Sequence, residues 1–527
     1  MTVTARGVCH TRLVARGVGL GAILSLVLAY AVLAQGGGWN QDSHYALIRA
    51  LDAGTPVIDR TRYETGATVT GDIAVYRGHT YSQKAPGLAF VSMPAYVVMK
   101  AAGKARPVAD PTGQLWFLGL WSVVLPALVL LLLVRKLANE LEPGLGTIAA
   151  LILGLSTLVL PFADQFFSHV LSALLVFAAF AVLWYERRGP PRLAYVAAAG
   201  LLAGYSVTTE FPNAMVLAIL GLFTLARSGW PRRALVYSAG ALAGLAPLLA
   251  YNAWAFGSPF HISYQNTVGF GTSRTLFFSG PSFRRLAEVL FAPTGILRTT
   301  PVLGLAVVGI VVLYRRGRRF EALAVTAVAF AFLALESCYT FAFGGAVPGP
   351  RYVIPMLPFL ALPLAVACRR MPLTTLVLAG VSAAEMVAAT ITHPAWYSQT
   401  SADWFHRLGT HDFTATVLAF FGHAQRDELD LLSSAHWYPL LLFFVPVAVA
   451  LAFAAAERPP LSPSRRDALR AGACLFGWLV MQHEGPKLLG NNAPVSAQWA
   501  PILVLSLAAV LFTTATALPV LLRPPRR

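Results

Sequence analysis

The chain has 527 residues, of which 57% are hydrophobic and only 12% are charged. With a mean hydropathy of +0.63 it is more apolar than a soluble protein of this length, so the composition excludes a soluble enzyme and indicates a multi-span membrane protein. The net charge of +17 does not indicate nucleic-acid binding, because the arginines stand in short clusters that bracket apolar runs. Four cysteines without C-x-x-C spacing indicate neither a metal knuckle nor a disulfide framework.

Apolar windows of about 18 to 22 residues, the length that crosses a hydrocarbon core of about 30 Å, predict an all-α integral membrane protein with about fourteen transmembrane helices. The spans are expected at residues 18–35, 113–134, 146–163, 168–185, 193–209, 212–228, 234–253, 299–314, 320–340, 352–368, 373–391, 438–456, 469–483 and 499–522. The apolar signal for a span is weakest at residues 469–483.

Basic clusters test this topology independently of hydropathy. If the N-terminus is cytoplasmic, every second loop is basic, as the positive-inside bias predicts. The clusters are Arg135-Lys136, Arg187-Arg188, Arg232-Arg233, Arg315 to Arg319, Arg369-Arg370, Arg465-Arg466 and Arg526-Arg527. Three long loops, residues 36–112, 254–298 and 393–437, then face the extracytoplasmic side of the cytoplasmic membrane, where we expect the chemistry.

The first apolar run ends in Val32-Leu33-Ala34, which loosely resembles a signal-peptidase site. The run is long, and a candidate catalytic loop follows it immediately. We therefore expect an uncleaved first span.

The first outer loop begins with Asn40-Gln41-Asp42-Ser43-His44-Tyr45. Apolar residues recur at helical spacing over residues 43–51, which predicts a short amphipathic helix at the membrane interface, with Asp42 just before it. An aspartate at that place has a structural explanation, because its side chain caps free backbone N–H groups. A functional role for Asp42 is the alternative.

The same loop continues to Tyr81-Ser82-Gln83-Lys84-Ala85-Pro86-Gly87, where a lysine precedes a Pro-Gly turn. Residues 86–103 are apolar, but their basic end falls on the outer side of the predicted topology. We therefore expect a second interfacial helix there rather than a span.

This layout resembles the lipid-phosphate-dependent glycosyltransferases of the GT-C superfamily, in particular the protein O-mannosyltransferase and aminoarabinose transferase clan. Further along the chain, Tyr251-Asn252-Ala253-Trp254-Ala255-Phe256-Gly257-Ser258-Pro259 and Phe343-Gly344-Gly345-Ala346-Val347-Pro348-Gly349-Pro350-Arg351-Tyr352 resemble stretches in uncharacterised bacterial members. The resemblance implies a GT-C transmembrane catalytic module over residues 1–370, followed by a C-terminal transmembrane region over 371–527.

The resemblance implies transfer of a sugar from a polyprenyl-phosphate donor to an extracytoplasmic acceptor, which is a glycolipid, a polysaccharide or a protein. Asp42 matches the base of the clan, and Lys84 matches the lysine that approaches the lipid phosphate. A lysine that contacts anionic membrane lipids is the structural alternative for Lys84. Where aminoarabinose transferases carry an acidic residue before this lysine, the chain has Gln83, so a metal ligand at that position is in doubt.

Arg351 follows Pro348-Gly349-Pro350 at the outer mouth of a span, where it is placed either to clamp the donor phosphate or to anchor the span end. Glu210 and Glu336 lie near the outer ends of their spans. Ionisable groups at membrane depth are expected to be functional or paired, and Glu336 is expected to pair with Arg351.

Asp164 and His169 lie in the tight outer turn between the third and fourth predicted spans. They are candidate ligands of a divalent cation or substrate contacts, although a turn-capping aspartate and a backbone-bonded histidine would give the same sequence. Metal-independent transfer is the default expectation. His261, in the second long loop, is a candidate acceptor contact, with a surface histidine as the simpler alternative.

Two other classes are alternatives. A transporter or lipid flippase also has many spans, but such carriers usually show related halves, short loops and charged helix breaks near the midplane, whereas this first outer loop has 77 residues. An inactive scaffold member of the family is the second alternative. The loop 393–437, with Trp396, Tyr397, Trp404 and Trp437, is expected either to shape acceptor choice or to form an interfacial aromatic belt.

Overall fold

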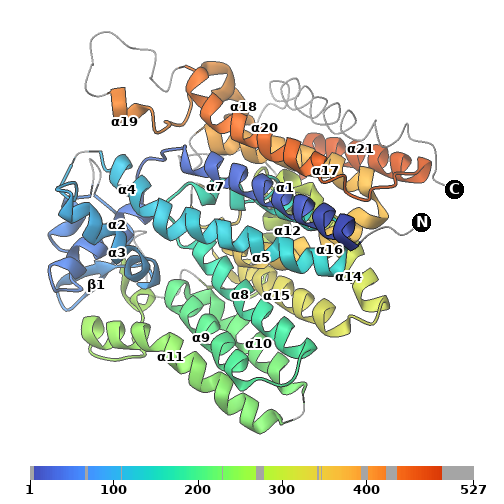
Figure 1. The fold of residues 1–527 in the computed structure, drawn as a ribbon. Helices are drawn as coiled ribbons and strands as arrows, with labels where there is room; N and C mark the ends of the chain where they lie inside the picture. The colour runs from blue at the N-terminus through green and yellow to red at the C-terminus, as the bar shows by residue number, and fades with distance from the viewer. Residues whose placement is uncertain are drawn as a thin grey trace.

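The computed structural model of the chain describes residues 5–488, apart from 66–68, 109, 228, 269–277, 341–342, 346, 393–400 and 423–435. It is a helical bundle, with α2, α3 and β1 grouped at one end (Figure 1). In chain order the elements are α1 (Ala5–Ala31), α2 (Trp39–Asp52), β1 (Ile73–Tyr76), β2 (His79–Ser82), α3 (Gly87–Ala101), α4 (Thr112–Gly119), α5 (Leu125–Leu141), α6 (Gly146–Leu155), α7 (Val159–Ala163), α8 (His169–Arg188), α9 (Leu193–Thr209), α10 (Ala214–Leu225), α11 (Trp230–Phe256), β3 (Thr267–Val268), α12 (Phe283–Phe291), α13 (Ile296–Thr299), α14 (Ala306–Arg315), α15 (Arg319–Cys338), α16 (Leu357–Arg370), α17 (Pro372–Ile391), α18 (Ser401–Thr410), α19 (Ala419–Gly422), α20 (Leu441–Ala456) and α21 (Arg465–Leu488).

The chain is a multi-pass membrane protein. Within the described residues, seven helical stretches are long and apolar enough to cross a membrane: Thr112–Leu141, His169–Arg188, Trp230–Phe256, Arg319–Cys338, Arg351–Arg370, Pro372–Ile391 and Tyr438–Ala456. Shorter apolar helices cover the predicted spans near residues 18–35, 146–163, 193–209 and 212–228. The predicted span 499–522 lies outside the described residues, so the total of fourteen stays a prediction.

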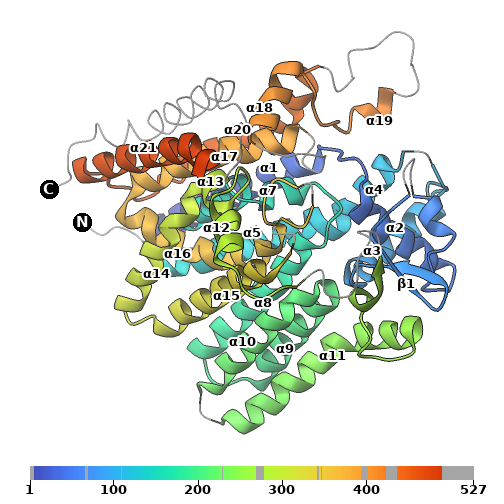
Figure 2. The ribbon, with the colours of Figure 1, turned by 180° about the vertical axis from the view of Figure 1, so that it is seen from behind.

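An eighth candidate span is broken. The segments Phe283–Thr299 and Pro301–Arg315 meet at an angle of 94°, whereas the sequence predicts a straight span over 299–314. The break has a local cause, because Thr300 leaves the helical region (φ −132°, ψ 62°) and Pro301 has no N–H to continue the helix. The turned segment places α12 and α13 beside α15 and α17 (Figure 2).

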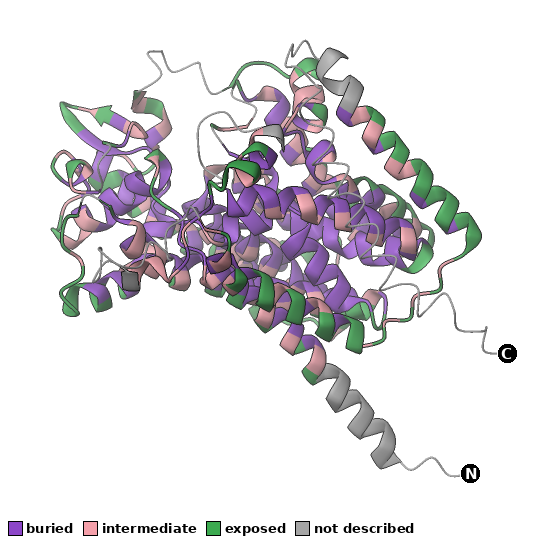
Figure 3. Ribbon diagram, turned by 90° about the horizontal axis from the view of Figure 1, so that it is seen from above, coloured by how far each residue is buried: buried purple, intermediate pink, exposed green. Residues whose placement is uncertain are grey.

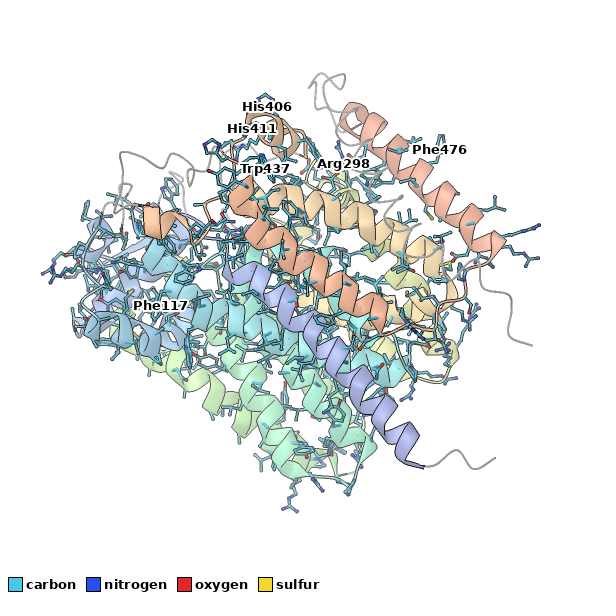
Figure 4. The ribbon with its side chains drawn as sticks, turned by 45° about the horizontal axis from the view of Figure 1, so that its top comes forward. Phe117, Arg298, His406, His411, Trp437 and Phe476 are labelled. Carbon is cyan, nitrogen blue, oxygen red and sulfur yellow. The ribbon has the colours of Figure 1, made fainter. Side chains whose placement is uncertain are left out.

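Burial separates the middle of the bundle from its rim (Figure 3). The most apolar 18-residue stretch of Arg351–Arg370 is entirely buried inside the protein. In α11, only 28% of the corresponding stretch is buried. α16 is therefore a central helix, and α11 presents much of its apolar surface outward, as expected of a helix that faces lipid. Phe476 on α21 is also largely exposed (Figure 4).

The chain is mostly helical, as predicted, and it contains one small sheet in addition. A three-stranded antiparallel sheet of order β2-β1-β3 joins the first long outer loop to the second. Arg77 (φ +50°) and Gly78 (φ +82°) form the two-residue connection between β1 and β2, and both adopt the left-handed conformation that such tight hairpins require. The sheet fixes the position of the loop that carries Lys84, immediately after β2.

The loops that the sequence assigns to the cytoplasmic side contact one another. Glu142 forms ion pairs with Arg316 and Arg369, and the side chain of Arg135 lies 3.1 Å from Glu457. At the other end, the first and second outer loops share the sheet, and Ala34 donates a backbone hydrogen bond of 2.8 Å to Ala415 in the third. Predicted inner and outer loops thus form two separate groups of contacts.

Glycines allow α9 and α11 to pack in direct backbone contact. Gly200 and Gly204 on α9 face Gly240 and Gly244 on α11, which gives a small-xxx-small pattern on both helices. A Cβ at Gly204 would lie 2.2 Å from the carbonyl oxygen of Ala241, a backbone atom that cannot turn away.

We expect Gly204→Ala to lower the thermal stability of the detergent-solubilised protein, because the added methyl group forces α9 and α11 apart. Overpacking of this kind costs about 1 to 3 kcal/mol. Thermal unfolding followed by intrinsic fluorescence would measure the change. Gly119→Ala is the matched control, since its Cβ would meet no atom within 4 Å. Equal midpoints for the two variants would contradict the packing account.

Candidate active site

A pocket opens where the first outer loop meets the ends of several helices. About 360 Å³ of space that no atom fills, part of it open to solvent, lies there. Its charged and polar lining comes from six segments that are far apart in the sequence: His44, Lys84, His169, Glu210, Tyr264 and Arg351. The structure therefore brings Lys84, Arg351 and His169 to one place, as a shared donor site requires.

Lys84 is fixed by an ion pair. Its ammonium lies 2.6 Å from a carboxylate oxygen of Asp72, and both side chains are largely buried. Gly87, after the Pro-Gly turn, approaches the end of α9 so closely that a Cβ would lie 2.7 Å from the carbonyl oxygen of Thr208. The glycine is thus needed to seat the lysine loop on the bundle.

Arg351 is buried at the pocket without a carboxylate partner among the described residues. Its guanidinium donates a long hydrogen bond of 3.4 Å to the hydroxyl of Tyr352 and lies 5.7 Å from the ring centre of Phe167. Its Nε has no hydrogen-bond partner within the described part of the chain. A buried cation normally needs a counter-charge, so this side chain favours an anionic ligand in the pocket.

The predicted ion pair between Glu336 and Arg351 is not formed. Glu336 is completely buried, and neither of its carboxyl oxygens has a hydrogen-bond partner among the residues that the structure describes. The prediction was wrong because closeness in sequence across a loop does not fix side-chain direction.

Asp164 and His169 have different partners. Nδ1 of His169 contacts Oε1 of Glu210, and the same oxygen accepts a 2.7 Å hydrogen bond from Ser168. Asp164 accepts a 2.6 Å hydrogen bond from Gln35 at the end of the first span. Within the described ranges, no three His, Cys, Asp or Glu side chains cluster with metal-binding geometry. A cation held by Asp164 and His169 together would require both to leave these partners.

Asp42 lies in the first turn of α2, not before the helix as the sequence predicted. The helix begins four residues early, at Trp39, with Gly38 as its N-cap, and no side chain caps it. The Asp42 side chain is only 2% exposed, and its Oδ1 has no hydrogen-bond partner within the described residues. The capping explanation for this aspartate is therefore wrong.

The environment of Asp42 changes its acidity. Burial raises its pKa to about 8, and the negative charge of nearby Asp72 adds to the increase. A carboxyl group with this pKa is mostly protonated at neutral pH, and it can accept a proton as a general base only after it has lost its own. Asp42 does not line the pocket, whereas Asn40 and His44 do. Asp42 lies two residues from each of them on α2, and side chains two residues apart on a helix point in different directions.

Three further residues of the predicted outer loops have other roles or were not anticipated. His261 contacts Asn266 and stacks on Phe256 with ring centres 5.1 Å apart, and it is not part of the pocket lining. Asp72 was missed by the sequence analysis, since only the fold brings it to Lys84. His44 was also missed, although its i, i+4 spacing from Asn40 places both on one helix face.

Comparison with known proteins gives structural matches only. No family model matches the chain, and no curated protein matches it in sequence. Two matches are crystal structures of ArnT from Cupriavidus metallidurans. One is bound to undecaprenyl phosphate (16% identity, 98% of this chain and 78% of that chain, TM-score 0.45), and the other is in the apo state (15% identity, 94% and 87%, TM-score 0.46).

A third match is the archaeal oligosaccharyltransferase AglB from Archaeoglobus fulgidus in complex with an inhibitory peptide and a dolichol-phosphate. The identity is 14%, the match covers 86% of this chain and 56% of that chain, and the TM-score is 0.42. The chain is similar to these three structures at identities of 14–16%.

The raised pKa of Asp42 predicts how stability depends on pH. The folded protein keeps the proton up to about pH 8, whereas an unfolded chain releases it near 3.8, so this residue's contribution to stability falls as pH rises between those values. The slope is at most about 1.4 kcal/mol per pH unit. Asp42→Asn should therefore lose less thermal stability than the parent between about pH 5 and about pH 8.

The control is Asp52→Asn, at the other end of α2, where the carboxylate pairs with Lys100. It should keep the pH slope of the parent. If Asp42→Asn also keeps that slope, the raised pKa is refuted.

Proposed function

We propose that the chain is a membrane glycosyltransferase that moves a sugar from a polyprenyl-phosphate donor to an acceptor on the extracytoplasmic side. The observation that carries the proposal is a buried arginine without a carboxylate partner, Arg351, beside Lys84 in one pocket. Two buried cations in one pocket of a membrane protein suit a phosphate that is attached to a lipid.

Lys84 and Arg351 would hold the donor phosphate by different means. The guanidinium can bind two phosphate oxygens at once, whereas the ammonium acts as a compact charge. Lys84 would exchange part of its contact with Asp72, 2.6 Å away, for the phosphate. Both cations then stabilise the charge that develops when the phosphate leaves.

Asp42 would be the base. Transfer breaks the bond between the anomeric carbon and the phosphate oxygen, which keeps the electron pair, and forms a bond from the acceptor oxygen to that carbon. Asp42 takes the proton of the acceptor hydroxyl. Attack from the face opposite the leaving group needs a base on that face.

The acceptor is proposed to be an envelope glycolipid, polysaccharide or protein. A divalent cation is not required for the steps assigned to Asp42, Lys84 and Arg351. If one takes part, Asp42, Asp164 and Glu336 are buried carboxyls with an oxygen that has no hydrogen-bond partner in the described part of the chain.

Radiolabelled sugar transfer from a panel of polyprenyl-phosphate donors tests the reaction class. We expect the purified parent to turn over, and Asp42→Asn to be slower by about 100-fold or more, since general-base catalysis contributes factors of this size. If no donor supports transfer while a labelled lipid or solute crosses proteoliposome membranes, the chain is a carrier instead. Full activity of Asp42→Asn would remove Asp42 as the base.

Donor binding tests the two cations. Lys84→Ala and Arg351→Lys should each weaken binding of a polyprenyl phosphate by about tenfold or more, because each charge-assisted hydrogen bond contributes about 1.5 to 3 kcal/mol. Titration with the lipid, followed by thermal stabilisation, gives the affinity. Lys100→Ala is the matched control, since this exposed lysine pairs with Asp52 away from the pocket. An unchanged affinity in Lys84→Ala would show that Lys84 does not bind the donor.

A further inference from the structure

His44 is a buried histidine with no hydrogen bond within the described structure. Its side chain is only 1% exposed, it lines the pocket, and neither Nδ1 nor Nε2 has a partner among the described residues. Whichever nitrogen carries the hydrogen, a neutral imidazole offers one donor and one acceptor. Leaving both unmet inside a protein is costly, so the arrangement calls for a ligand.

The other histidines near the site contact polar protein atoms: Nδ1 of His169 contacts Glu210, and His261 contacts Asn266. The Nε2 of His169 has no hydrogen-bond partner in the described part of the chain, which is also true of both ring nitrogens of His44. His44 lies edge-on to Phe166, with the ring centres 6.2 Å apart. The ring is thus held in place by packing, and its polar atoms remain available to the pocket.

The charges around His44 favour the neutral ring. Burial holds its pKa well below the usual value, and Lys84, His169 and Arg351 lower it further. The pocket also contains Glu210, which contacts His169, and the hydroxyls of Tyr264 and Tyr352. A neutral imidazole can therefore donate a hydrogen bond there without adding a third full positive charge to an empty pocket.

We propose that His44 is a catalytic residue that donates a hydrogen bond from its neutral ring to the departing phosphate oxygen, while its other nitrogen accepts one from a sugar hydroxyl. A glycosyl phosphate carries such an acceptor and such a donor side by side. The inference rests on the proposed function. His44 exchanges no proton in this role, since the acceptor proton goes to Asp42 and the electron pair to the phosphate oxygen.

The steady-state rates of three variants test this role. His44→Ala should lower kcat by about 100-fold to 1000-fold, the loss seen when one preorganised donor to a developing oxyanion is removed. His44→Gln or His44→Asn should recover at least about tenfold, because an amide N–H replaces one ring N–H without titrating. If the kcat of His44→Ala equals that of the parent, the proposal is overturned. It is also overturned if His44→Ala loses activity and neither amide variant restores the kcat.

The affinity for polyprenyl phosphate distinguishes a failure of this inference from a failure of the proposed reaction class. Polyprenyl phosphate resembles the departing group, so His44→Ala should bind it about tenfold more weakly than the parent does, and the exposed His406→Ala should bind it as the parent does. If the parent transfers no sugar, this loss would still support His44 as a phosphate contact while the glycosyltransferase proposal failed. Equal affinity of the parent and His44→Ala would remove His44 from the phosphate site in either case.

Discussion

The ion pair between Asp72 and Lys84 connects the parts of the site. The carboxylate holds the ammonium at 2.6 Å, and the backbone carbonyl of the same aspartate accepts a 2.6 Å hydrogen bond from Ser43, next to Asp42. The charge of Asp72 also raises the pKa of Asp42. One residue, immediately before the central strand of the small sheet, thus positions the proposed phosphate-binding lysine and raises the pKa of the proposed base. A change in its position would affect both.

The pocket concentrates polar groups that the protein itself does not satisfy. The pocket atoms without hydrogen-bond partners among the described residues include Nε of Arg351 and both ring nitrogens of His44. A stable core normally pairs such atoms. Their grouping at the end of the bundle where the predicted outer loops meet is the expected arrangement for a site that a lipid-borne, charged and hydroxylated ligand completes.

The broken span is the feature most similar to a carrier, and it has a structural explanation. Arg298, beside the break, bonds the side chain of Gln482 on α21, and Trp478 of the same helix donates a 2.7 Å hydrogen bond to its carbonyl oxygen. These contacts attach α21 to the bundle. The break therefore anchors a peripheral helix, and none of the residues that line the pocket with Lys84 and Arg351 belongs to this segment.

Hydropathy and basic clusters determined the membrane class, most span positions and the division into two sets of loops, because these depend on composition over about twenty residues. Local turn chemistry around Lys84 and Arg351 marked both as candidates. Only the tertiary structure decided which side chains meet: Asp72 reaches Lys84 across a hairpin, Glu210 reaches His169 from another helix, and Glu336 does not pair with Arg351. Sequence spacing fixes neighbours along a helix or loop, whereas contacts between distant segments depend on the packing of the whole bundle.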